Sequence, residues 1–218
     1  MRKLLKKISN PFLKFCFDYY YRKPRKFSYQ NITILVHPEV FSPKFTISTK
    51  LLLNYIKPLN LNHKNVLELG CGSGIISLFA ASKGANVVAS DINLIALEAL
   101  KKASKKNNIN LKIIHSNLFE KIESKNFDYI IINPPYYPMT PKNDKERAWF
   151  CGENFEYFES LFSQLNISLK QEIIMILSQD CEISKIKSIA SKNKLKLKCL
   201  IETKVLGEKN YIFKIENR

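Results

Sequence analysis

Asn133, Pro134, Pro135 and Tyr136 place an amide, two stiff residues and an aromatic ring directly after the apolar run at residues 129–132. Proline fixes φ and donates no backbone hydrogen bond, so the turn is rigid and its carbonyls are left as acceptors. Ligands of open α/β sheets bind beyond the carboxyl ends of strands. An amide oxygen, free carbonyls and an aromatic face in such a crevice are suited to hold a planar NH2 group. Pro-Pro turns also serve as simple punctuation, so the role of this one depends on the rest of the chain.

A glycine-rich turn follows another apolar run, at residues 66–69, and precedes a helical pattern that starts at Ile75. Gly70, Gly72 and Gly74 allow sharp turning and close approach of the backbone to a ligand, and the helix offers its N-terminus. Isoleucine replaces the third glycine of a dinucleotide fingerprint, and no phosphate-loop Gly-Lys-Ser or Gly-Lys-Thr follows. Asp91 ends the next apolar run, near the spacing at which a carboxylate meets ribose hydroxyls. Together these residues predict an adenosine-containing ligand.

These motifs resemble those of the class I S-adenosylmethionine-dependent methyltransferases. Within that class they are most similar to the release-factor glutamine N5-methyltransferases and their relatives that methylate adenine N6, which share the Asn-Pro-Pro-Tyr motif. The resemblance extends from about residue 40 to residue 215, and four segments carry it: residues 41–53, 68–74, 133–136 and 148–154. The last segment favours the glutamine enzymes.

The chain departs from the pattern of that family at four points. Asn117 stands where relatives commonly have aspartate. Ser48 stands before Thr49 where members often have aspartate, and Cys151 replaces the first of two glycines. Bacterial glutamine methyltransferases also tend to carry a helical substrate-recognition domain in front. About 40 residues precede the motifs here, so the length is more similar to that of the compact archaeal and eukaryotic enzymes.

The resemblance implies a Rossmann-like, seven-stranded, mostly parallel sheet with an antiparallel C-terminal hairpin and helices on both faces. It implies S-adenosyl-L-methionine as cofactor, bound by Glu68, Gly70, Gly72, Gly74, Asp91, Asn117, Leu118 and Thr49. In this assignment the glycines meet the methionine part, Asp91 the ribose, and Asn117 with Leu118 the adenine. Asn133 and the Pro134 carbonyl would accept the two N–H groups of the acceptor, and Tyr136 would stack on it.

Periodicity in the sequence predicts the same architecture without the resemblance. Short apolar or β-branched runs predict strands near residues 65–69, 86–90, 111–115, 127–132 and 171–177. Helical spacing predicts helices at residues 75–84, 93–106, 153–168 and 183–192, with Asn93 as the cap of the second. Strand and helix alternate, which indicates a parallel sheet. Residues 195–204 and 210–215 predict a closing hairpin with its turn at residues 206–209.

Charge is concentrated at the start of the chain. The 218 residues carry a net charge of +16, and residues 1–64 hold 13 basic against 2 acidic side chains. We therefore divide the chain into a basic, aromatic extension at residues 1–40 and a methyltransferase domain at residues 41–218. Aromatic rings interleave with the basic residues, so contact with RNA or the ribosome through residues 1–26 is one hypothesis. The alternatives are an amphipathic helix packed on the sheet and a membrane-surface segment.

Cysteine usage and hydropathy indicate the cellular compartment in which the protein is expected. Five cysteines without a CxxC pair, and only three histidines, favour neither a zinc site nor a disulfide framework, and a reduced cytoplasm is expected. No apolar run reaches the ~18 residues of a membrane span, and the basic start lacks the apolar core of a signal peptide.

Three functions remain open. The favoured one is methylation of a glutamine amide in a translation protein, and the second is methylation of adenine N6 in RNA or DNA. The third is a silent scaffold that only binds the cofactor. The resemblance to compact glutamine methyltransferases also leaves open a small partner subunit.

Overall fold

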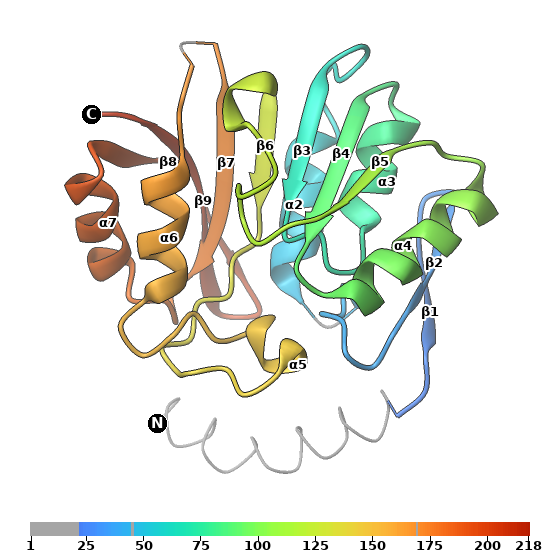
Figure 1. The fold of residues 1–218 in the computed structure, drawn as a ribbon, viewed down its shortest axis with the longest axis horizontal. Helices are drawn as coiled ribbons and strands as arrows, with labels where there is room; N and C mark the ends of the chain where they lie inside the picture. The colour runs from blue at the N-terminus through green and yellow to red at the C-terminus, as the bar shows by residue number, and fades with distance from the viewer. Residues whose placement is uncertain (1–21, 45, 169) are drawn as a thin grey trace.

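The computed structural model describes residues 22–44, 46–168 and 170–218, which build a seven-stranded mixed sheet with helices on both faces (Figure 1). In the sheet the strands follow the order β5-β4-β3-β6-β7-β9-β8. The first five of these run parallel, whereas β9 is antiparallel to both β7 and β8. The predicted fold class is confirmed. Its strands are β3 (Asn65–Leu69), β4 (Asn86–Asp91), β5 (Lys112–His115), β6 (Tyr129–Ile132), β7 (Glu172–Ser178), β8 (Leu195–Val205) and β9 (Glu208–Asn217).

The central strands are apolar without interruption because both of their faces are covered. In β6, Ile131 joins one buried cluster, whereas Ile130 and Ile132 join the other. Neighbouring side chains of a strand point to opposite faces, so a strand buried twice needs such a run. One cluster holds residues of α2 (Ile47–Ile56), α3 (Ile75–Ser82) and α4 (Leu94–Asn107), and the other those of α6 (Glu156–Gln164) and α7 (Ile183–Lys192).

A hairpin that the sequence analysis did not predict lies beside α4. Its strands β1 (Arg25–Tyr29) and β2 (Ile32–Val36) pair antiparallel and form a separate two-stranded sheet (Figure 1). The Asn107 side chain donates to the Thr33 carbonyl (2.8 Å) and accepts from the Thr33 N–H (2.9 Å). Tyr29 packs edge-on against Phe79, with ring centroids 5.1 Å apart. Residues 25–36 of the predicted extension are therefore packed on the helices of the domain. The boundary at residue 40 stays a prediction, and residues 1–21 of the proposed arm lie outside the described residues.

Other elements differ from the prediction in their bounds. The Asn93 cap is confirmed, since its side-chain oxygen accepts from the N–H groups of Ile95 (2.9 Å) and Ala96 (3.3 Å). The helix predicted at residues 153–168 is the shorter α6, because Leu165 is already extended. The final turn is also tighter than predicted: only Leu206 and Gly207 separate β8 from β9, and both have positive φ, as a two-residue hairpin requires.

Three findings bear on the chemistry that the described residues offer. None of their helices is both long and apolar enough to cross a membrane. No group of three or more His, Cys, Asp or Glu side chains among them is arranged to hold a metal ion. The four cysteines in this part of the chain, Cys71, Cys151, Cys181 and Cys199, are free thiols.

Candidate active site

The glycine loop joins β3 to α3 and is tied to the end of β4. The Cys71 N–H donates to the Ser90 carbonyl (2.8 Å), and the Gly72 N–H donates to Asp91 Oδ2 (2.7 Å). Gly74 has φ +69°, and a Cβ there would lie 2.4 Å from the Leu100 side chain. Gly70 has φ +70°, but a Cβ there would meet nothing within 4 Å. The loop is therefore packed tightly at its helix end and open at its strand end.

Asp91 is fixed by the backbone on both of its oxygens. Oδ2 accepts from Gly72 N–H, and Oδ1 accepts from the Asn93 N–H (2.9 Å). Burial raises the pKa of this carboxyl, and the backbone hydrogen bonds from Asn93 and Gly72 oppose the rise. Its remaining lone pairs are available as acceptors at the strand end, and the ribose role assigned to Asp91 stays a prediction.

Glu68 is a buried acid on β3 whose partner was not predicted. Its Oε2 accepts from the Ser77 N–H (2.7 Å) and from the Ser77 hydroxyl. Burial raises the pKa of Glu68 to about 8, although both hydrogen bonds from Ser77 act to lower it. The carboxyl therefore holds its proton at neutral pH and would ionise if a cation were bound beside it.

The Asn133 side chain presents a buried, unpaired acceptor at the end of β6. Its Oδ1 has no hydrogen-bond partner within the described residues. An unpaired buried polar atom is costly, so such an oxygen is suited to a donor that arrives with a ligand. Pro134, the next residue, is buried, and the ring of Tyr136 contacts that of Tyr137 with centroids 4.9 Å apart. Burial raises the pKa of the Tyr136 hydroxyl, so it stays protonated.

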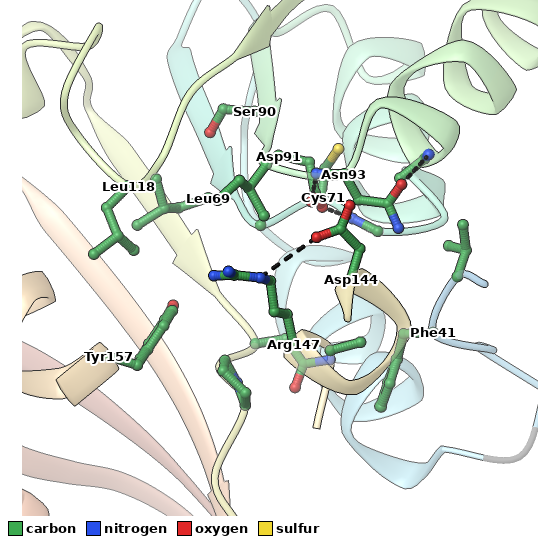
Figure 2. A pocket seen from close by; sticks show the side chains of 18 of the residues that line it. Phe41, Leu69, Cys71, Ser90, Asp91, Asn93, Leu118, Asp144, Arg147 and Tyr157 are labelled. Atoms are coloured by element: carbon green, nitrogen blue, oxygen red, sulfur yellow. Dashed lines mark hydrogen bonds and ion pairs between the residues drawn. The ribbon is translucent and has the colours of Figure 1, made fainter. Parts of the chain in front are cut away.

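One cavity of about 560 Å³ joins the glycine loop to the turn after β6. Figure 2 shows Leu69, Asp91 and Leu118 around it, with α5 (Asp144–Arg147) on its near side. The predicted site residues that line the cavity are Thr49, Glu68, Gly70, Gly72, Asp91, Asn117, Leu118 and Asn133. Those that do not line it are Gly74, Pro134 and Tyr136. The structure thus brings both predicted motifs to one cavity.

The residues predicted for the adenine and lid sides differ in their surroundings. Asn117 is exposed, and its amide donates to Glu120 Oε1 (2.7 Å) rather than into the cavity. Leu118 follows it in a left-handed conformation with φ +48°. Thr49 is buried, with its hydroxyl 3.2 Å from that of Thr46.

Sequence reasoning missed several lining residues because no motif marks them. Ser90 is buried, and its hydroxyl has no partner within the described residues. Tyr157 comes from α6 and lies on the same side of the cavity as Leu118 (Figure 2). Arg147 Nε lies 3.4 Å from Asp144 Oδ1 at the cavity wall (Figure 2). Only the apolar spacing of α6, which buries Phe158, Leu161 and Phe162, could have indicated which side of that helix faces inward.

The sheet order and the loop-to-turn cavity define a class I methyltransferase, a class that uses S-adenosylmethionine. The residues fit this cofactor: Gly70 leaves open space, while Asp91 and Glu68 offer carboxylates for hydroxyl groups and an ammonium. The model of the methyltransferase small domain matches residues 31–148, and the chain belongs to that family.

Individual relatives cover part of the chain. A protein of Methanocaldococcus jannaschii, provisionally named a protein N5-glutamine methyltransferase, is 41% identical over 112 residues, which make up 51% of this chain and 54% of the relative. The ribosomal RNA small subunit methyltransferase C of Haemophilus influenzae is 38% identical over 111 residues, 50% of this chain and 33% of the relative. The chain thus spans about half, or less, of the length of these curated relatives.

Solved structures share the fold at low identity. The E. cuniculi Mtq2–Trm112 complex, described as responsible for methylation of the eRF1 translation termination factor, aligns with a TM-score of 0.62 at 21% identity. That match covers 83% of this chain and 99% of that one. A T. thermophilus 16S rRNA methyltransferase, solved with AdoMet and guanosine, also gives 0.62 at 21% identity and covers 90% of this chain and 50% of that one. At such identity the likeness concerns the fold alone.

Proposed function

We propose that this chain is an S-adenosylmethionine-dependent N-methyltransferase that methylates a glutamine side-chain amide of a translation protein. The observation that carries this proposal is the buried, unpaired Oδ1 of Asn133, a residue that lines the same cavity as the glycine loop. An amide NH2 group has two N–H donors, and one of them would satisfy this oxygen. The relative from M. jannaschii adds support for an amide acceptor.

In the proposed mechanism the chain aims the acceptor nitrogen. Bound S-adenosylmethionine supplies a methyl group on a positively charged sulfur. Asn133 Oδ1 accepts one N–H and the Pro134 carbonyl accepts the other, which draws the nitrogen lone pair out of conjugation and towards the methyl carbon. The acceptor nitrogen held in this way would take the methyl group that the cofactor supplies, with the bonding pair left on the cofactor, and would then lose a proton to solvent. Tyr136 is proposed to hold the planar group by its ring.

The remaining predicted residues are proposed to bind the cofactor. Gly70 and Gly72 let the backbone approach the methionine part, and Asp91, held by two backbone N–H groups, accepts the ribose hydroxyls. Glu68 ionises against the ammonium, and Leu118 covers the adenine. Gly74 does not line the cavity, and its role is to let the glycine loop pack closely on Leu100 of α4.

Charge at the cavity favours a neutral protein amide over a nucleic acid. Besides the protonated Glu68, the described lining includes four carboxylates but one guanidinium, that of Arg147, which is paired with Asp144. Carboxylates repel the phosphates that flank any base of RNA or DNA. The acidic lining residues are Glu39, Glu68, Asp91, Asp144 and Glu156.

Two other functions would use the same fold. Methylation of an exocyclic amino group of RNA or DNA, such as adenine N6, is the second candidate, because the rRNA methyltransferase C of H. influenzae is among the relatives. A scaffold that binds the cofactor without transfer is the third. Transfer of radiolabelled methyl groups to a cell extract, followed by separate protease and nuclease digestion, distinguishes them. Label released by protease supports the glutamine acceptor, and label released by nuclease rejects it. Cofactor binding without any label supports the scaffold.

The proposal also covers the compartment and partners. We place the enzyme in the cytoplasm, where translation proteins are made, and assign RNA or ribosome contact to residues 1–26. A small partner subunit is a further proposal, supported by the Mtq2–Trm112 complex of similar fold. Co-expression with a candidate subunit, followed by size-exclusion chromatography and the transfer assay, tests whether activity requires it.

A further inference from the structure

The segment that follows β2 crosses the glycine loop. The Glu39 carbonyl accepts from Asn93 Nδ2 (3.3 Å), which fixes the segment to the start of α4. A Cβ at Gly72 would lie 3.8 Å from the Cβ of Phe41. Phe41 therefore sits in van der Waals reach of the loop that is proposed to bind the cofactor, and it also lines the cavity (Figure 2).

Phe41 meets Trp149, which comes from the segment directly after α5. The two ring centroids lie 4.7 Å apart with an interplanar angle of 52°. Ala148 and Phe150, the neighbours of this tryptophan, line the cavity. The ring contact thus joins two chain segments that are remote in sequence and stand at one cavity.

The backbone of Trp149 in turn holds the acceptor turn. Its carbonyl accepts from the N–H groups of Tyr136 (3.2 Å) and Tyr137 (3.0 Å). Tyr137 and Phe150 form a single parallel bridge beside these bonds. A displacement of Trp149 would therefore displace the turn that carries Asn133.

We propose that Phe41 and Trp149 form a positioning pair, through which the segment over the glycine loop sets the Asn133 to Tyr136 turn against the bound cofactor. This inference rests on the proposed methyl transfer. Neither ring touches the reacting atoms in this assignment. Aromatic contacts of this geometry contribute enough beyond their buried area to change a rate by about tenfold when lost.

A double-mutant cycle tests the coupling. Phe41→Ala and Trp149→Ala are each expected to lower kcat/KM for methyl transfer by about tenfold, and the double variant by about tenfold as well, because both remove one contact. The dissociation constant for S-adenosylhomocysteine should change by less than about threefold. Phe41→Tyr and Trp149→Phe keep two rings and should restore most of the activity. If kcat/KM of the double variant instead falls by the product of the two single losses, the two rings act independently and the proposed pair is wrong.

Fluorescence tests the same pair without an acceptor, so its result is independent of which molecule is methylated. Trp149 is the sole tryptophan of the sequence. S-adenosylhomocysteine should change its emission in the wild type and in Tyr29→Ala, a variant that loses a ring contact elsewhere. The change should be absent in Phe41→Ala and in the milder Phe41→Leu, at temperatures where melting curves show both folded. An unaltered response in either Phe41 variant overturns the inference.

Discussion

At the scale of single residues, Asn133 is the sharpest test of the chemistry. Asn133→Ala removes a buried amide oxygen on the acceptor side that lacks a partner within the described residues. Loss of a hydrogen bond aimed at a reacting group typically lowers kcat by about 10²–10³-fold. We expect that loss in radiolabel transfer, with affinity for S-adenosylhomocysteine within about threefold. Asn86→Ala, an exposed change at the start of β4, is the control. Wild-type turnover in Asn133→Ala would remove this residue from the mechanism.

Glu68 predicts a pH dependence of stability. Its folded pKa of about 8 lies above the ordinary value of 4.5, so the folded chain binds more protons than the unfolded chain between these pH values. The free energy of unfolding should therefore fall as the pH rises from about 4.5 to 8. Glu68→Gln cannot ionise, so this part of the fall should disappear. Urea unfolding of both proteins at several pH values measures the difference, and parallel pH profiles would contradict the assignment.

At the scale of elements, the α3 start depends on Gly74. A Cβ there would clash with Leu100, which is buried, and it would add left-handed strain. At Gly70 the strain is similar, but the space is open. Gly74→Ala should therefore lower the free energy of unfolding by about 2–4 kcal/mol, and Gly70→Ala by about 1–2 kcal/mol. Denaturant titration measures the free energy of unfolding of both variants. Equal losses would show that the Leu100 side chain moves aside without a cost in stability.

Periodicity in the sequence predicted the strands that lie within the seven-stranded sheet. The runs at β3, β6 and β7 are almost entirely apolar and buried on both faces, so they are recognisable as central strands. In β2, Ile32, Ile34 and Val36 alternate as a half-buried strand should, but the basic charge around them favoured an extension. What buries them is packing on α3 and α4, a tertiary contact that no local pattern reveals.

The residues of the site also divide into those that a sequence motif predicts and those that depend on the positions of other elements. Gly70, Gly72, Asp91 and Asn133 belong to motifs with a spacing that the chemistry requires, and they meet at one cavity. Tyr157 depends instead on where α6 begins, which Phe155 sets through a left-handed φ of 64°. α5 has only four residues, too few for a period, and its start is capped by Asn143, which accepts from the Glu146 N–H (3.0 Å).

At the scale of the whole molecule, the charge is arranged in two opposing ways. The net charge is +16, yet carboxylates outnumber cations at the cavity. An even coat of lysine from biased composition would attract nucleic acid everywhere, the cavity included. Because the basic residues are concentrated before residue 65, the part of the chain that would attract a polyanion is different from the part that is proposed to bind the acceptor. A ribosome-associated protein acceptor fits this separation, because the basic segment would hold RNA while the cavity takes an amide.

Removal of residues 1–21 tests that separation. The deletion ends before β1, so the hairpin on α4 is kept, and it removes Arg2, Lys3, Lys6, Lys7 and Lys14. If all five contact phosphates, the slope of log affinity against log salt for single-stranded RNA should fall by about 3–4. Fluorescence anisotropy over a salt series measures this slope.

The matched control replaces four exposed lysines near α7 and β8 by glutamine. This lowers the net charge by four, as the deletion does, because the deletion removes five basic residues together with the acidic Asp18. The exchanged positions are Lys185, Lys194, Lys198 and Lys204. A general electrostatic attraction would reduce the slope equally in both variants, whereas a specific arm reduces it only in the deletion. Methyl transfer to a purified protein acceptor should stay near the wild-type rate in either variant, because both variants keep every residue that is proposed to bind the cofactor and the acceptor. Equal slopes in the two variants would show that the N-terminal basic residues act only through the net charge of the protein.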